Sequence, residues 1–175
     1  MDETKNNAAY IIKRIDEISG INPGKKVLQK MIFLMVEKGI PLNYEYGLHF
    51  YGPYSALLGT EVNYLHANDI IHLNYTDYSH EMKINGNDTV LPKGLSSEDI
   101  AAIDDVIKTF IHKSPSDLEL LSTAIYAHKY LENKSKESVV EGVLKIKGKK
   151  YTREEIHRSF ENFNYFNKTF SSLSL

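Results

Sequence analysis

Residues 70–84 are IIHLNYTDYSHEMKI, in which a run rich in β-branched and aromatic residues, 70–76, and the shorter run 80–84 flank residues 77–79. This composition is typical of two paired strands, here at residues 70–76 and 80–84, with residues 77–79 as the loop between them. A third short strand is predicted at residues 89–91. The remaining periodicity is mostly helical, so this hairpin and the elements that precede it decide between an all-helical and a mixed fold.

Three helices are predicted in this N-terminal half, at residues 4–19, 25–38 and 54–67, because apolar residues recur there every three to four positions. The aromatic segment 44–51 is predicted to be extended. Gly52-Pro53 is expected to end that segment, so that the proline begins the third helix. The order helix, helix, short strand, helix and hairpin is that of a winged helix, whose third helix can enter a DNA major groove.

Two residues inside these helices carry further expectations. Lys30 is expected at the edge of the second helix, together with Lys25, Lys26 and Lys38, because the apolar residues fill its other faces. Gly59 lowers the helix propensity of the third helix by about 1 kcal/mol relative to alanine. Its presence predicts close packing of that helix against another backbone.

The C-terminal half is predicted to be helical throughout. Ser96 with Asp99 and Thr152 with Glu155 form capping boxes at two helix starts. The four helices expected there are 97–112, 115–132, 136–146 and a last one from residue 152. We therefore predict a mainly helical α+β fold, in which a winged-helix-like N-terminal half with a β-hairpin packs against a C-terminal helical bundle.

The domain organisation follows from the one plausible boundary, Pro92-Lys93-Gly94. It divides the chain into a winged-helix-like unit, residues 1–91, and a helical unit, residues 92–175. Three residues are too few for an independent linker, so we expect both units to share one core.

Composition excludes several classes of protein. The chain is 42% hydrophobic and 25% charged, which is normal for a globular protein and unlike a disordered one. It has no cysteine, which excludes disulfides and thiolate metal sites. The longest apolar run, Met31–Val36, is far shorter than the ~20 residues that span a bilayer. The polar, acidic start has no signal-peptide pattern, so we expect a cytoplasmic protein without a membrane partner.

The charge is unevenly distributed along the chain. The net charge is −2, yet residues 145–175 carry seven basic and three acidic side chains. One interpretation is a solvated, lysine-rich turn, and the other is a contact patch for phosphates or an acidic partner. The candidate phosphate contacts are Lys145, Lys147, Lys149, Lys150, Arg153 and Arg158.

A pair of motifs carries a resemblance. Residues 28–34 are LQKMIFL and residues 49–55 are HFYGPYS, and together they resemble the YwgA-like family of small uncharacterised proteins. Residues 118–126, LELLSTAIY, are similar to a second segment of that family. The first two motifs are also loosely similar to the Panacea group, whose members act as antitoxins that bind a partner protein. The resemblance implies a binding or structural signature and transfers no catalytic residue.

Two interpretations of this signature remain open. In the structural one, Gly52 and Pro53 shape a turn, and the Gln29 amide next to Lys30 bonds the backbone of that turn. In the functional one, clustered tyrosines form the floor of a ligand or peptide groove, because their rings offer rigid contact area with a polar tip. The tyrosines concerned are Tyr44, Tyr46, Tyr51 and Tyr54.

Motifs for catalysis are lacking. The seven histidines form no His-x-x-x-His pair, and the sequence has no phosphate-binding glycine loop or dinucleotide fingerprint. We therefore expect neither an enzyme nor a metal or cofactor site. The predicted function is a regulatory or antitoxin-like protein-interaction module, with homodimerisation possible.

A winged-helix nucleic-acid-binding regulator is the alternative. The predicted third helix has no lysine or arginine, and its Glu61 would be repelled by phosphates. Phosphate contacts would then fall to the basic residues near 150. For the favoured function we expect Tyr51 and Tyr54 to be partly exposed, and that basic cluster to lie away from the third helix.

Overall fold

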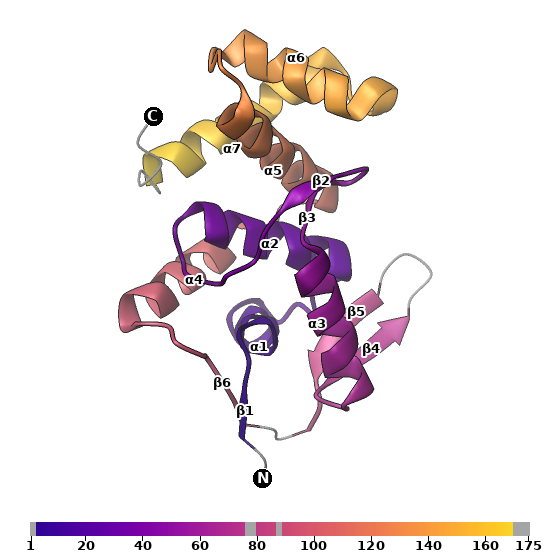
Figure 1. The fold of residues 1–175 in the computed structure, drawn as a ribbon, viewed down its shortest axis with the longest axis vertical. Coiled ribbons are helices and arrows are strands. Elements are labelled where there is room, and N and C mark those ends of the chain that lie inside the picture. The colour runs from indigo at the N-terminus through magenta and orange to yellow at the C-terminus, as the bar shows by residue number, and fades with distance from the viewer. Residues whose placement is uncertain (1–2, 76–79, 87–88, 170–175) are drawn as a thin grey trace.

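The fold was described from a computed structural model, in which residues 3–75, 80–86 and 89–169 form seven α-helices, one 3-10 helix and six short strands (Figure 1). In chain order these elements are β1 (Glu3–Lys5), α1 (Asn7–Ser19), α2 (Lys25–Glu37), β2 (Gly47–His49), β3 (Gly52–Tyr54), α3 (Ala56–Ala67), β4 (Ile71–Tyr75), β5 (His80–Ile84), β6 (Thr89–Leu91), α4 (Ser97–Phe110), α5 (Pro115–Tyr130), α6 (Lys136–Lys147), the 3-10 helix η1 (Gly148–Lys150) and α7 (Arg153–Thr169). The strands pair two by two, so the fold is mainly helical α+β, as predicted.

Helix α2 lies at the centre of the molecule, between α1 and α4 on one side and α5 on the other (Figure 1). Its side chains are buried on nearly every face. The buried apolar residues of both halves form one hydrophobic core, with Ile12 and Phe33 from the N-terminal half and Phe110, Ile125 and Val143 from the C-terminal half. The stretch 92–94 therefore does not separate two cores.

The helix ends follow local sequence closely. The capping box of Ser96 and Asp99 is present at the start of α4. At the start of α7 the Thr152 N–H donates to Glu155 Oε2 at 2.7 Å, and the Glu155 N–H donates to Thr152 Oγ1 at 3.2 Å. The first helix begins later than predicted, because Asn6 caps it by accepting from the Ala9 N–H.

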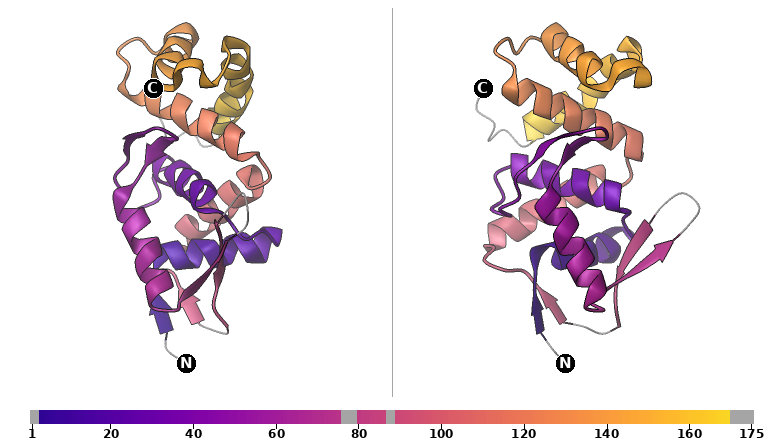
Figure 2. Two further views of the ribbon diagram at one scale, coloured as in Figure 1. Left: turned by 90° about the vertical axis from the view of Figure 1, so that its right-hand side faces the viewer. Right: turned by 45° about the vertical axis from the view of Figure 1, so that its right-hand side comes forward.

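The β4–β5 hairpin is antiparallel with Ile71 opposite Ile84, which confirms the predicted pairing. Its loop, residues 77–79, lies outside the described residues. The predicted third strand exists as β6, but its partner is β1 at the other end of the half, in a parallel pair with Thr4 opposite Val90. Figure 2 shows α3 and the β4–β5 hairpin beside one another, with the β2–β3 hairpin reaching from α3 to α5.

The segment before α3 differs from the prediction. Strands β2 and β3 form a hairpin with Leu48 opposite Pro53, so the proline lies in a strand and does not begin the helix. Helix α3 begins at Ala56, and the Ser55 hydroxyl caps it by accepting from the Leu58 N–H. Proline is tolerated here because the sheet has only two strands, so its missing N–H does not interrupt a larger hydrogen-bond ladder. Serine, in contrast, is a preferred residue at a helix N-cap.

Candidate functional site

The β2–β3 hairpin rests directly on α5. Gly52 has a φ of +87°, and a Cβ atom at this position would lie 2.7 Å from Thr123 Oγ1 on α5. Only glycine combines this backbone angle with so close an approach. The glycine of the His-Phe-Tyr-Gly-Pro-Tyr motif therefore sets how near the hairpin lies to the C-terminal helices.

Two buried polar side chains of α2 hold the strand that leads into α3. The Gln29 amide makes a pair of hydrogen bonds with the Ser55 backbone, donating to its carbonyl and accepting from its N–H, both at 2.9 Å. Lys30 Nζ donates to the Pro53 carbonyl at 2.6 Å. The hydrogen bond predicted between the Gln29 amide and the backbone thus forms, but its partner is Ser55, which follows the 50–53 turn. Lys30 is not at an edge as expected, since it is 2% exposed.

A buried carboxylate organises the other side of the hairpin. Glu119 on α5 is fully buried and pairs with Lys26 at 2.6 Å, Lys147 at 2.8 Å and Lys150 at 2.7 Å. Lys147 Nζ also donates to the Phe50 carbonyl at 3.1 Å, at the tip of the hairpin. We call these four charged residues the Glu119 cluster. It ties α2, α5, α6 and η1 to the hairpin.

The charges in this region perturb one another. Burial raises the pKa of Glu119, but the hydrogen bonds from Lys147, Lys150 and Lys26 outweigh it and bring the pKa down to about 2. Burial lowers the pKa of Lys30 to about 7, and the positive charge of Lys147 acts in the same direction. Glu119 is therefore ionised at neutral pH, and burial makes the charged form of Lys30 costly.

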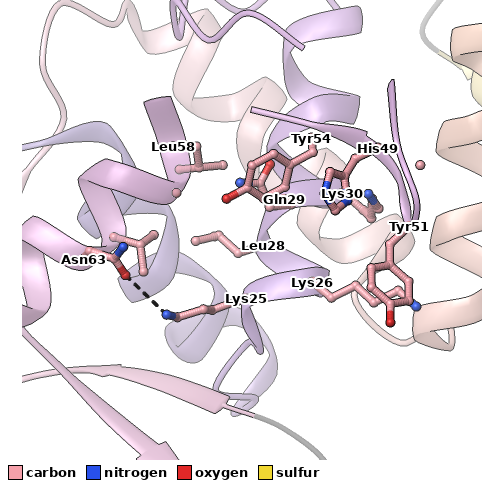
Figure 3. Close-up of a pocket in the computed structure, with 13 residues that line it drawn as sticks. Lys25, Lys26, Leu28, Gln29, Lys30, His49, Tyr51, Tyr54, Leu58 and Asn63 are labelled. Atoms are coloured by element: carbon pink, nitrogen blue, oxygen red, sulfur yellow. Dashed lines mark hydrogen bonds between the residues drawn. The ribbon is translucent and has the colours of Figure 1, made fainter. Parts of the chain in front are cut away.

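A cavity of about 310 Å³ opens between the start of α2, α3 and the β2–β3 hairpin, and we call it the α2 cavity (Figure 3). Its apolar part comes from Leu28, Leu58 and Val62, and the rings of Tyr51 and Tyr54 flank it. Its polar part comes from Lys25, Lys26, Gln29, Lys30, His49 and Asn63.

Large apolar side chains are exposed outside this cavity. Phe50 at the hairpin tip is 73% exposed, whereas Tyr51 and Tyr54 are 50% and 40% exposed, which confirms the partial exposure predicted for the two tyrosines. A shallow groove between β2 and the first turn of α3 shares His49 and Tyr54 with the α2 cavity. We call the exposed apolar residues of the β2–β3 hairpin and the first turn of α3 the hairpin surface; they are Leu48, Phe50, Tyr51, Tyr54 and Leu57.

The other two tyrosines of the predicted groove do not reach the α2 cavity, although Tyr46 lines the shallow groove together with Tyr54. Tyr44 is buried and donates a hydrogen bond to Glu61 Oε2 at 2.5 Å, and burial together with this bond raises its pKa. Tyr46 donates to the Gln29 carbonyl at 3.2 Å. Glu61 on α3 accepts the bond from Tyr44 and another from Asn6. Neither Tyr44 nor Tyr46 lines the α2 cavity.

Gly59 has a different role from the one predicted. A Cβ atom there would collide with the Tyr54 hydroxyl group. The glycine thus makes room for a side chain of the hairpin surface, not for another backbone.

The basic residues near 150 do not act as one patch. Lys147 and Lys150 point inward to Glu119, and Arg153 pairs with Glu137 and Glu141 on α6. The remaining members are exposed, namely Lys145, Lys149 and Arg158.

Glu119 and Lys26 were missed as site residues from the sequence. A signal for Glu119 was present, because it is an acidic residue within the apolar run Leu118–Ile125, on a helix buried along most of its length. Its lysine partners come from three other elements, so no local pattern pairs them with it.

The described residues contain no group of three or more histidine, cysteine, aspartate or glutamate side chains that could hold a metal ion. None of the helices in this part of the chain is long and apolar enough to cross a membrane.

Comparison with known proteins gave one kind of relative. No family model matches the chain, so the looser similarity to the Panacea group gains no support. The uncharacterised protein YwgA of Bacillus subtilis (strain 168) is 30% identical over 150 residues, covering 82% of this chain and 86% of the relative. Identity of this extent over most of both proteins establishes a common family. The chain therefore belongs to the YwgA family.

Proposed function

We propose that this protein is a non-enzymatic, regulatory or antitoxin-like module that acts by binding a partner protein through the hairpin surface. The observation that carries the proposal is that the hairpin exposes apolar side chains to solvent while its backbone is held by buried hydrogen bonds. Five large apolar side chains face solvent on one short hairpin and the helix turn after it. A soluble monomer rarely groups such residues unless they serve an interaction.

The backbone that presents these side chains is rigidly held. Gln29, Lys30 and Lys147 each donate to a different carbonyl between Phe50 and Ser55. A surface that is ordered before binding loses less conformational entropy when the partner arrives. Aromatic side chains that are partly exposed and rigidly mounted are the usual energetic centres of protein interfaces.

The nucleic-acid-binding alternative has less support. Helix α3 offers no lysine or arginine, and two of the six candidate phosphate contacts are engaged by the buried Glu119. Binding to random duplex DNA at low salt, weakening steeply as salt rises, would favour this alternative over the proposal.

The proposal is tested by affinity capture with the full chain from an extract of its own host. The variants are Phe50→Ser and Leu57→Ser, and the matched control is Tyr64→Ser, which removes a largely exposed ring from the C-terminal half of α3. We expect one protein to be retained by the wild type and the control but not by the two variants. The complex should then form again from purified components.

Self-association is measured first, by sedimentation of the purified chain over a range of concentrations. A dimer that Phe50→Ser dissociates would identify a second copy of the chain as the partner. Identical captured proteins for wild type, Phe50→Ser and Leu57→Ser would show that the hairpin surface does not bind a partner.

A further inference from the structure

We infer that the α2 cavity is a binding site for a small organic anion, that is, a carboxylate or phosphate group carried on a compact apolar body. This inference goes beyond the proposed function and does not depend on it. The cavity shares Tyr51 and Tyr54 with the hairpin surface, but Leu48, Phe50 and Leu57 of that surface do not line it.

The first argument is the balance of charge. Lys25, Lys26 and Lys30 line the cavity, and no aspartate or glutamate does so among the described residues. Lys25 donates to the neutral Asn63 Oδ1 at 3.3 Å, and Lys26 pairs with Glu119. Glu119 must also neutralise Lys147 and Lys150, so one carboxylate serves three ammonium groups before Lys30 is considered.

The second argument is the state of Lys30. An ammonium group has three N–H donors, and within the described residues the structure gives this one a single acceptor, the Pro53 carbonyl. Lys30 is buried, and it forms no ion pair with the carboxylates of this part of the chain. A buried charge that lacks a counterion is costly. An anion in the cavity would supply both the missing acceptors and the missing negative charge.

The third argument is the position of the α2 N-terminus. The first turn of α2, which contains Lys25 and Lys26, forms part of the cavity wall. This turn has no acidic residue and no side-chain cap. The partial positive charge of a helix N-terminus therefore adds to that of the lysines and favours an anion at this end of the cavity.

The shape of the cavity defines the rest of the ligand. Leu28, Leu58 and Val62 provide an apolar floor, and Tyr51 and Tyr54 provide aromatic walls. Two cations lie close to the Tyr51 ring, with Lys26 Nζ 5.1 Å and Lys150 Nζ 4.9 Å from its centroid. The volume of about 310 Å³ is at the lower end of the range of ligand pockets, which excludes a dinucleotide and suits an aromatic or branched acid.

Binding is measured by calorimetry and by chemical-shift mapping on the full chain with four probes. Two are amphipathic anions, 3-phenylpropionate and phenyl phosphate. The third is the uncharged 3-phenylpropan-1-ol, and the fourth is inorganic phosphate. We expect at least one amphipathic anion to bind with a Kd below about 1 mM, and to bind about tenfold more tightly than the alcohol or inorganic phosphate.

Two variants locate the site. Lys30→Met keeps the length of the side chain and removes its charge, and Lys26→Met does the same at a partly exposed position where loss of folding is not expected. Each should weaken the anion about tenfold or more, with little effect on the alcohol. Lys108→Met, at an exposed position of α4, is the matched control and should bind as the wild type does.

A further probe distinguishes the source of the anion. A five-residue peptide with blocked ends, carrying one glutamate between leucines, represents an acidic side chain of a partner protein. Tighter binding of this peptide than of 3-phenylpropionate assigns the cavity to a partner's side chain, and the reverse order assigns it to a free small molecule. Either order supports an anion site.

The inference is overturned if the acids bind no better than the alcohol, or if Lys26→Met and Lys30→Met both bind them as the wild type does. Failure of the proposed function would look different. Phe50→Ser and Leu57→Ser should leave binding of 3-phenylpropionate unchanged, because neither residue lines the cavity, whatever their effect on partner capture.

Discussion

The buried carboxylate of Glu119 provides the sharpest test of how the two halves are held together. Replacing it in Glu119→Gln keeps the shape of the side chain and removes its charge. The Lys147 side chain, which is 1% exposed, would then lie in the interior without a counterion. Removing one partner of a buried ion pair destabilises a protein by about 3–5 kcal/mol.

Lysines 26 and 150 add less to this loss. Their side chains are 35% and 32% exposed, so water solvates their ammonium groups once the carboxylate has gone. We therefore assign the expected loss of about 3–5 kcal/mol mainly to Lys147. A domain of this kind has a free energy of unfolding of roughly 5–15 kcal/mol, so Glu119→Gln should remain folded but much less stable.

The measurement is urea unfolding followed by far-ultraviolet circular dichroism. The matched control is Glu137→Gln, since Glu137 also pairs with a cation, Arg153, but is exposed. It should change the free energy of unfolding by no more than about 0.5 kcal/mol. The double variant Glu119→Leu/Lys147→Met should recover most of the stability, because it leaves unpaired only Lys26 and Lys150, which are partly exposed to water.

Two results would contradict this reasoning. A loss below about 1 kcal/mol for Glu119→Gln would mean that the carboxylate contributes no more than a surface pair. A double variant as unstable as the sum of its single variants would mean that Glu119 and Lys147 act independently.

Three further predictions concern the glycines of the site and the acid stability. Gly52→Ala should lower the free energy of unfolding by more than about 1 kcal/mol, because φ is +87° and the new Cβ would lie 2.7 Å from an α5 hydroxyl oxygen. The control is Gly47→Ala, because nothing lies within 4 Å of a Cβ atom at that position. Equal melting temperatures for the two variants would refute the turn geometry. Gly59→Ala should leave the melting temperature nearly unchanged, because the gain in helix propensity offsets the displacement of the Tyr54 ring. The side-chain NMR signals of Tyr54 should change. Unchanged signals would contradict the close approach of Tyr54 to Gly59. The pKa of Glu119 is lowered from 4.5 to about 2, so its contribution to stability is complete above pH 4.5 and is lost as the pH falls to 2. The difference in free energy of unfolding between wild type and Glu119→Gln should therefore become smaller as the pH falls from 4.5 to 2. A difference that stays constant would show that the charge of Glu119 does not contribute to stability.

Much of the secondary structure was accessible from the sequence because it depends on neighbours along the chain. Apolar spacing located the helices, and the capping boxes at Ser96 and Thr152 marked two helix starts within one residue. The β4–β5 hairpin was predicted because its strands are close in the sequence. Pro53 was wrongly predicted to begin a helix. Proline favours a helix start, but here the pairing of β2 with β3 overrides that preference and places Pro53 in a strand.

The candidate site was predicted only in part. Its motif residues Gln29, Gly52 and Tyr54 were singled out correctly as neighbours of one turn, and Gln29 was expected to bond backbone. The α2 cavity was not foreseen, because it depends on how α2, α3 and the hairpin are inclined to one another. Tyr44 and Tyr46, close to these residues in the sequence, lie outside it.

The sequence by itself determined the order of the helices, the β4–β5 hairpin and the family. Tertiary structure alone decided which charges are buried and what neutralises them. Lys30 has no local feature that separates it from exposed lysines, and the apolar neighbours of Glu119 in the sequence do not identify its lysine partners, since burial of a charge depends on partners brought from distant segments. The parallel pairing of β1 with β6 has the same cause, because about eighty intervening residues must fold before the two strands can meet.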